Sequence, residues 1–138
     1  MIAYVDSSVI LRRILGQAGA LKEWPSIERA VASALVETEC LRTLDRARVA
    51  GALTDTEVAR RRKAVYEVLE MLELIGVTRP VLSRASQPFS TVLGTLDAIH
   101  LASALIWREQ SESEIVMATH DAALATAARA NGLAAIGA

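Results

Sequence analysis

The sequence has little of what secreted and membrane-spanning proteins depend on. Its 138 residues contain a single cysteine, Cys40, so no internal disulfide can form and no cluster of thiolates can hold a metal. A lone cysteine is typical of a reducing compartment. No apolar run approaches the ~18 residues that a membrane span requires. The first residues also lack the basic start of a secretion signal. We therefore expect a cytoplasmic protein.

Aromatic residues are also scarce, at 4% of the chain, and the apolar content of 52% is carried mainly by alanine, leucine and valine. This composition favours helices packed on a small parallel sheet over an all-β sandwich. We find no repeat, no low-complexity tract and no linker. The chain length suits one hydrophobic core, so we expect a single domain over residues 1–138.

An excess of positive charge is missing as well. The chain has 15 basic and 16 acidic residues, a net charge of −1, and so no overall basic field of the kind that marks many nucleic-acid-binding proteins. The candidates for contacts with nucleic acid are local clusters, at residues 12–13, 42–48 and 60–63. The last of these is more typical of a solvated helix face.

Several catalytic motifs are absent. The sequence has no glycine-rich phosphate loop, no G-x-S-x-G elbow, no H-x-x-x-H pair and no Cys/His cluster. These absences argue against nucleotide-binding P-loop proteins, serine hydrolases and zinc sites.

Short apolar runs alternate with stretches of helical spacing. The runs predict strands at residues 2–5, 30–32, 77–78, 115–118 and, at an edge, 133–136. The spacing predicts helices over residues 9–16, from the N-cap Ser33 to 51, over 54–76, from Pro80 onward, over 96–107 and from 122 to about 131. This alternation indicates one α/β domain with a parallel sheet and helices on both faces.

The helix predicted over residues 54–76 has two further features. It begins with Thr54-Asp55-Thr56-Glu57, the form of a capping box. Apolar residues then recur at helical spacing, as Val58, Val65, Leu69, Leu72 and Ile75. So small a domain can cover this stripe only in part, which predicts a homodimer.

Four carboxylates are candidates for chemistry. Asp6 and Asp121 each follow a predicted strand and precede a helix, and ligands of open parallel sheets bind at such strand ends. Asp97 lies near the start of a helix, and Glu39 borders the apolar stripe of its own. Taken singly, each aspartate is a typical helix cap and Glu39 a solvated carboxylate. His100 is more typical of a partly buried, hydrogen-bonded histidine than of a ligand.

Considered together, the carboxylates indicate a metal site. Several carboxylates that converge without a cation repel one another and raise their own pKa values. Bound Mg²⁺ or Mn²⁺ removes this penalty, because hard cations prefer carboxylate and water oxygens. Such an ion activates water and stabilises charge on a phosphate. We therefore predict a divalent-cation site suited to phosphodiester hydrolysis, formed by Asp6, Glu39, Asp97 and Asp121.

Four segments resemble the motifs of the PIN domain family and, more narrowly, of VapC-like toxins of toxin–antitoxin pairs. Residues 4–11 (YVDSSVIL) resemble the family's first strand and its aspartate, and residues 39–42 (ECLR) resemble its Glu-x-x-Arg helix segment. Residues 96–104 (LDAIHLASA) are the most specific match, and residues 118–121 (ATHD) resemble the final acidic segment. The four segments occur in the family's order and span the chain.

The resemblance implies a five-stranded parallel sheet in the order 3-2-1-4-5, a Mg²⁺-dependent endoribonuclease and a cognate antitoxin protein. It assigns the family's acidic roles to Asp6, Glu39, Asp97 and Asp121. The arginine three residues after Glu39 favours Glu39 over Glu37 as the motif residue.

The remaining roles follow from the same resemblance. We expect Asp6 and Asp97 to hold the ion most directly and Glu39 and Asp121 to orient its waters, with Asp121 acting on the ion directly or through water. Ser8 or Thr119 gives polar support, and Arg42 or Arg46 meets the RNA backbone. Two alternatives remain open. One is an RNA-processing or structure-specific nuclease of the same fold, and the other is a non-catalytic module that binds a protein.

Overall fold

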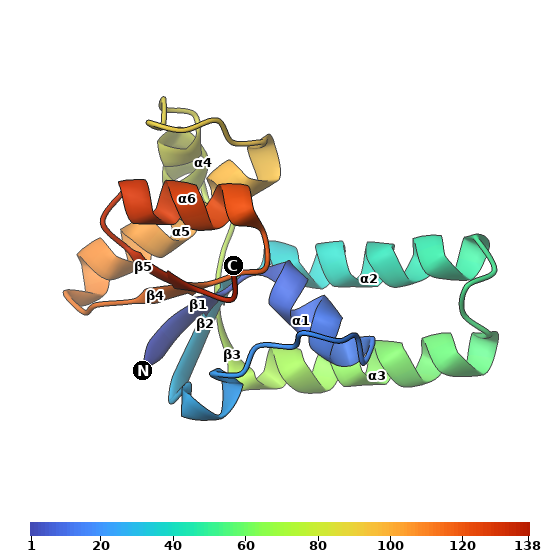
Figure 1. Cartoon of the computed structure of the whole chain (residues 1–138). Helices are drawn as coiled ribbons and strands as arrows, with labels where there is room; N and C mark the ends of the chain where they lie inside the picture. Colours follow the sequence, from blue (N-terminus) through green and yellow to red (C-terminus); the bar gives the residue numbers. More distant parts are fainter.

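One sheet of five parallel strands forms the centre of the computed structural model, which describes residues 1–138, and its order is β3-β2-β1-β4-β5 (Figure 1). Each pair of neighbouring strands is parallel. The α/β class and the strand order are therefore confirmed. The strands are β1 (Ile2–Val5), β2 (Arg29–Ser33), β3 (Leu72–Ile75), β4 (Val116–Ala118) and β5 (Ala134–Ile136).

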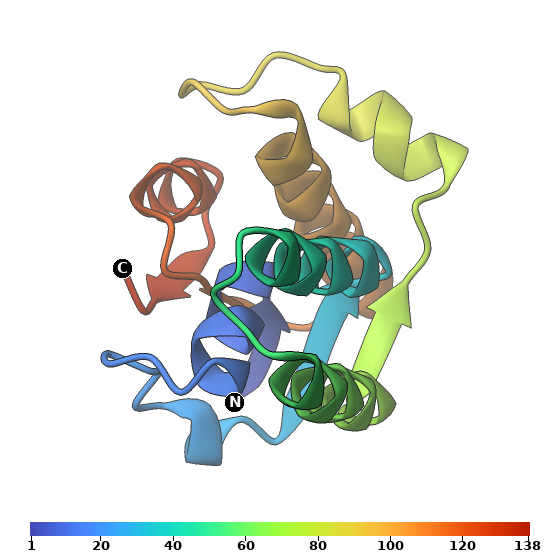
Figure 2. The ribbon, with the colours of Figure 1, turned by 90° about the vertical axis from the view of Figure 1, so that its right-hand side faces the viewer.

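Helices make the crossovers that parallel strands require. They are α1 (Ser7–Ile14), α2 (Leu35–Val49), α3 (Asp55–Met71), α4 (Arg79–Ala85), α5 (Thr95–Ser111) and α6 (Ala122–Ala130), with a short 3-10 helix η1 (Trp24–Ser26). Helices α2 and α3 run side by side as a hairpin that extends beyond the sheet in Figure 1 and is seen end-on in Figure 2. None of the helices combines the length and the apolar character that crossing a bilayer demands.

The sheet separates two hydrophobic cores. Successive side chains of a strand point to opposite faces. Accordingly, Ala3 and Val5 of β1 join the core beneath α1, α2 and α3, while Tyr4 joins the core beneath α5 and α6. Val31 and Met117 face the same side as Tyr4. Helices on both faces bury the central strands fully, which explains why these strands read as short continuous apolar runs.

The predicted end of the third helix and the predicted third strand were wrong. The capping box is present, since the Thr54 hydroxyl accepts the Glu57 backbone N–H at 3.2 Å. However, α3 ends at Met71 rather than at Gly76, and β3 begins at Leu72 rather than at Val77. In the structure Leu72–Ile75 pair with residues 30–33 of β2. Pairing with β2 therefore overrides a local apolar spacing that continues the helix.

The apolar stripe from which we predicted a homodimer is already covered by the chain itself. Val65 is fully buried, and Val58 and Leu72 are each 9% exposed. Val65 and Leu72 belong to the core beneath α1 and α2, and Leu69 packs against that core. The stripe on α3 is therefore internal and needs no second copy.

The prediction that Ser33 is the N-cap of the second helix is wrong by one residue. Ser33 ends β2, and Ala34 occupies the cap position of α2. The Ser33 hydroxyl still accepts the backbone N–H of Leu35, at 3.1 Å, so it satisfies a donor that the helix leaves free. The remaining element boundaries differ from the predictions by a few residues.

Candidate active site

Asp6 lies at the end of the central strand β1, directly before α1. Its backbone N–H donates to the carbonyl of Ala118, at 3.0 Å, so the β1–β4 pairing extends to this residue. Asp6 is 3% exposed, and its Oδ2 accepts hydrogen bonds from the hydroxyls of Ser8 (2.7 Å) and Thr119 (2.9 Å). Hydroxyl donors satisfy a carboxylate that burial would otherwise penalise.

Ser8 and Thr119 connect Asp6 to the loop before α6. The Ser8 hydroxyl accepts the backbone N–H of His120 at 2.9 Å, and the Thr119 hydroxyl accepts that of Asp121 at 3.0 Å. Each hydroxyl therefore donates to Asp6 and accepts from the segment after β4. Both residues predicted as polar support lie against the Asp6 carboxylate.

Asp121 and Asp97 differ in whether their carboxylates accept a hydrogen bond. Asp121 is the N-cap of α6, and its Oδ1 accepts the backbone N–H of Leu124 at 2.9 Å. The capping interpretation therefore holds for Asp121. Asp97 is the third residue of α5, whose N-cap is Gly94, and its carboxylate takes part in none of the side-chain hydrogen bonds of the structure. Both carboxylates are half-buried.

The pKa of Asp97 responds to the charges of the other three candidate carboxylates. Burial is the largest cause that raises this pKa, to about 6. The negative charges of Asp121 and Asp6 are the next largest causes, and that of Glu39 adds to them. Residues that are more than 110 positions apart in the sequence therefore share one region of negative potential at the carboxyl ends of β1 and β4.

Glu39 is bound by a histidine rather than by another candidate residue. Its Oε1 lies 2.6 Å from Nε2 of His100, a fully buried residue of α5. The same Nε2 lies 3.6 Å from Oδ1 of Asp6, and Nδ1 of the ring lies 2.7 Å from the Tyr4 hydroxyl. The neighbouring Glu37 is exposed and has no such contact.

His100 is the residue of the site that the sequence interpretation undervalued. It is hydrogen-bonded, as expected, but it is fully rather than partly buried, and it also contacts two of the predicted carboxylates. Burial lowers its pKa, whereas the hydrogen bond with Glu39 and the charges of Asp6 and Glu39 raise it by more. The available signal was its spacing, because residues three apart on a helix are neighbours and Asp97 precedes it by three.

The donor set fits a hard, hydrated cation. No group of three or more histidine, cysteine, aspartate or glutamate side chains is close enough together to hold an ion. Mg²⁺, however, commonly takes one or two protein carboxylates and keeps several waters. The carboxylate of Asp97 has no protein donor, and a cation beside it would remove the repulsion that raises its pKa.

A pocket of about 310 Å³ opens beside Glu39, a size typical of ligand sites. Arg42 and Arg46 of α2 line it, and neither forms an ion pair with a carboxylate. The Arg46 guanidinium donates to the Thr43 hydroxyl at 3.2 Å. The other lining residues, which the sequence interpretation did not single out for this role, are Ser7, Leu11, Leu35, Thr38 and Leu96.

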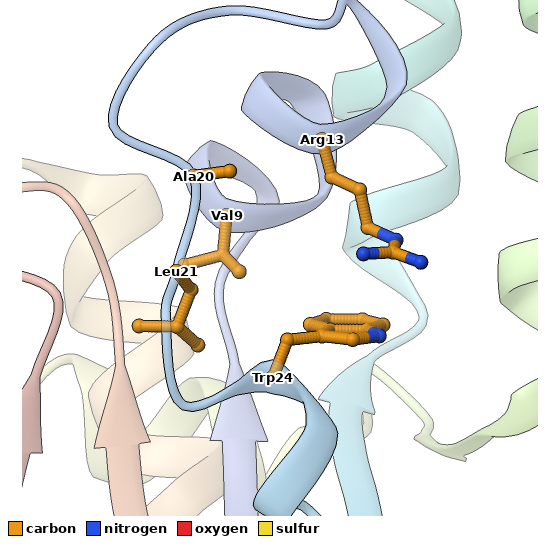
Figure 3. A pocket seen from close by; sticks show the side chains of 5 residues that line it. All are labelled: Val9, Arg13, Ala20, Leu21 and Trp24. Atoms are coloured by element: carbon orange, nitrogen blue, oxygen red, sulfur yellow. The ribbon is translucent and has the colours of Figure 1, made fainter.

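The basic pair at residues 12–13 is occupied by packing instead. Figure 3 shows the Arg13 guanidinium over the ring of Trp24, 4.9 Å from its centroid. The space between Arg13, Trp24 and Leu21 is about 10 Å³, too small for a nucleotide. Arg12 donates to the carbonyl of Gly19 at 3.4 Å. Of the predicted basic clusters, the one on α2 is therefore the one that borders the carboxylates.

Comparison with known proteins agrees with this fold. A solved structure of a toxin–antitoxin complex from Klebsiella pneumoniae has a similar fold, with a TM-score of 0.63 and 15% sequence identity. The similarity covers 86% of this chain and 86% of that one, and at this identity it shows the fold alone. No curated protein matches the sequence. The family description "PIN domain" matches residues 3–136. Because this match spans nearly the whole chain, the protein belongs to the PIN domain family, whose members are generally nucleases.

Proposed function

We propose that the chain is a Mg²⁺- or Mn²⁺-dependent endoribonuclease that acts in the cytoplasm as the toxin of a toxin–antitoxin pair. One observation carries the catalytic part of this proposal. The Asp97 carboxylate has no protein donor, yet it lies in the field of three other carboxylates that raise its pKa. An arrangement that is unfavourable without a cation supports a site for one.

Asp6 and Asp97 are the residues that would hold the ion most directly. One oxygen of Asp121 already accepts the Leu124 backbone N–H as the cap of α6, and Glu39 is bound to His100, which suits both to orienting water rather than to binding the ion alone. When bound, the ion supplies activation of a water and stabilisation of charge on the scissile phosphate. The hydroxyls of Ser8 and Thr119 keep Asp6 in one orientation, and a fixed ligand positions the reacting groups.

RNA is the substrate class that the neighbouring pocket supports. Arg42 and Arg46 line the pocket beside Glu39 and form no ion pair with a carboxylate, and guanidinium groups bind phosphate oxygens in a two-pronged geometry. The wall also contains apolar side chains from Leu35 and Leu96, against which a nucleotide base can pack. A single strand, with its bases unstacked, suits such a pocket better than a duplex.

The direct experiment compares nucleic acids and metals. Protein freed of any partner is incubated with single-stranded RNA, structured RNA and DNA, in Mg²⁺, in Mn²⁺ and in EDTA. We expect RNA cleavage with either metal and none in EDTA. Asp97→Asn should lower cleavage by at least ~10²-fold, a typical effect of removing one catalytic group, without unfolding the protein. Glu37→Gln is the matched control, because Glu37 is an exposed carboxylate on the same helix as Glu39.

The other outcomes of this experiment favour the alternatives. Equal cleavage in EDTA contradicts the metal-dependent mechanism. Cleavage of DNA but not RNA favours a structure-specific DNA nuclease. Metal binding without cleavage of any nucleic acid favours a non-catalytic binding module.

The toxin role requires a separate test, and the fold shared with a toxin–antitoxin complex supports it. We expect a small neighbouring gene to encode a DNA-binding protein that binds this chain. Expression of the chain alone should stop growth, and coexpression of the neighbour should restore it. An RNA-processing enzyme would instead be tolerated when expressed alone.

We also propose a homodimer, on a different surface from the one expected. Exposed apolar side chains lie in and near β3, the edge strand that pairs with β2 on one side and with no strand on the other. Their exposed fractions are 62% for Met71, 42% for Leu74, 40% for Val77 and 43% for Leu82. An exposed edge strand with apolar neighbours is a surface that another chain can pair with, and a second copy is the partner always available to it.

A further inference from the structure

A line of hydrogen bonds crosses the molecule from β2 to α2, through two fully buried side chains. The Ser33 backbone N–H donates to the Tyr4 hydroxyl oxygen at 3.2 Å. The Tyr4 hydroxyl lies 2.7 Å from Nδ1 of His100, and Nε2 of that ring lies 2.6 Å from Oε1 of Glu39. Tyr4 and His100 are both 0% exposed.

The chemistry of these groups sets the direction of the bonds. An ionised carboxylate only accepts, so the proton in the short contact with Glu39 belongs to Nε2 of His100. The Tyr4 oxygen accepts from the backbone of Ser33, which leaves its own hydrogen to donate to Nδ1. In the neutral ring, every donor and acceptor of the line is then satisfied, and the tautomer is fixed with its proton on Nε2.

The position of Nε2 distinguishes this histidine from one that is merely buried and satisfied. The atom lies 2.6 Å from Glu39 and 3.6 Å from Oδ1 of Asp6, so one N–H group stands between two carboxylates. Those carboxylates come from different elements, Glu39 from α2 and Asp6 from the end of β1. Without a donor between them they would repel each other, and the glutamate side chain would be free to turn toward solvent.

We propose that His100 is a positioning residue, whose Nε2–H holds the Glu39 carboxylate beside Asp6 while Tyr4 keeps the proton on Nε2. The inference rests on the proposed metal site for its consequence, but the geometry can be tested without cleavage. Groups that hydrogen-bond to metal ligands orient them, and their loss commonly lowers metal affinity by 10- to 100-fold. The hydrogen bonds that orient His100 continue to two strands of the sheet, since Tyr4 belongs to β1 and Ser33 to β2.

Mn²⁺ binding measured by calorimetry provides the first test. We expect His100→Leu to weaken Mn²⁺ binding by about 10- to 100-fold. His100→Gln should recover most of the loss, because its amide can donate to Glu39 from nearly the position of Nε2. Tyr4→Phe should give a smaller loss. Unfolding temperatures of the metal-free variants are measured in parallel, so that a change of affinity is compared only among folded proteins.

A double-mutant cycle separates positioning from general damage. Glu39→Gln removes the carboxylate that His100 is proposed to hold. In that background, His100→Leu should weaken Mn²⁺ binding hardly further, because the two residues act through one contact. Wild-type affinity in His100→Leu would overturn the proposal, and so would losses from His100→Leu and Glu39→Gln that simply add.

Nitrogen NMR of the wild-type, metal-free protein tests the same geometry with no substitution in the site. The chain contains two histidines, so His120→Gln identifies the signals of His100. We expect a proton on Nε2 of His100. A ring protonated on Nδ1 alone, with a bare Nε2 facing Glu39, would overturn the proposal. If the wild type binds no Mn²⁺, the proposed function fails, whereas this measurement still decides whether His100 holds Glu39.

Discussion

The negative charge of Asp97 destabilises the folded state of the metal-free protein. The pKa of Asp97 is raised to about 6, so its ionisation is less favourable in the folded chain than in the unfolded one. Protonated Asp97 carries no such penalty. The free energy of unfolding of the metal-free protein therefore falls as the pH rises from the ordinary aspartate pKa through about 6, because Asp97 loses its proton over this range. It stays at the lower value above that pH.

Asp97→Asn should therefore raise the stability of the metal-free protein at pH 7, by about 1 to 2 kcal/mol after allowance for solvent screening. Asp121→Ala should lower it by about 1 kcal/mol, because it removes the N-cap of α6. Denaturant unfolding in EDTA measures both. The expectation for Asp97 fails if its substitution leaves stability unchanged at pH 7 and at pH 4 alike.

The two arginines of the pocket should contribute to RNA binding rather than to stability. Arg42→Ala or Arg46→Ala should weaken binding of a short RNA and reduce the salt dependence of its dissociation constant by about one phosphate contact each. Binding is measured in the Asp97→Asn background, where cleavage is slow. Arg48→Ala is the control, since Arg48 lies on the same helix but pairs with Asp45 at 2.8 Å. An equal effect of all three substitutions would indicate only a general loss of charge.

The sequence predicted where the candidate carboxylates lie in the fold better than it predicted their contacts. Asp6 and Asp121 are recognisable because a residue that follows an apolar run and precedes a helix lies at a strand end. His100 was recognisable as buried, but its partners Tyr4 and Glu39 are 96 and 61 positions away. Such pairings depend on strand order and helix packing, so spacing along the chain does not reveal them.

Among the elements, β3 is joined to two others by the side chain of Glu73. Glu73 of β3 accepts hydrogen bonds from the Arg29 guanidinium of β2, at 2.8 Å, and from the Trp107 indole of α5, at 3.2 Å. The Arg29 guanidinium also lies over the Trp107 ring, 5.2 Å from its centroid. These contacts join the edge strand to its neighbour and to the helix on one face of the sheet.

The hydrogen bond from Arg29 is the largest cause that lowers the pKa of Glu73. Its stabilising effect is therefore present above the ordinary glutamate pKa and is lost as the pH falls through the lowered value. Glu73→Gln should destabilise the protein at pH 7 by less than about 1 kcal/mol, since the pair is exposed. The difference from wild type should vanish in acid. Glu70→Gln, an exposed carboxylate without an ion pair, is the control in the same unfolding measurement.

The same region shows where element prediction failed. The start of α3 was predictable because a capping box needs only residues 54–57. Its end was not, because Leu72 and Ile75 continue the helical spacing while their backbone pairs with residues 30 and 33 of β2. A competition between a local pattern and a pairing with a distant strand cannot be decided from the local pattern.

For the whole molecule, the exposed apolar residues around β3 predict the oligomeric state. Light scattering at micromolar concentration should give about twice the chain mass of 14.8 kDa. Leu74→Lys should halve the measured mass, because a charge on the edge strand β3 opposes pairing with a second copy. Val92→Lys, at a residue 94% exposed in a different loop, should leave the mass unchanged. A wild-type mass near that of one chain would contradict the dimer.

The distribution of the carboxylates along the chain affects how the protein is made. Asp6 emerges first during synthesis, but its strand lies at the centre of the sheet and must wait for β4 to cover one side. Thr119 and Asp121 follow only after β4. The site therefore stays incomplete until β4 and the segment after it have been synthesised. The proposed nuclease can therefore act only after the last of its four carboxylates has been synthesised.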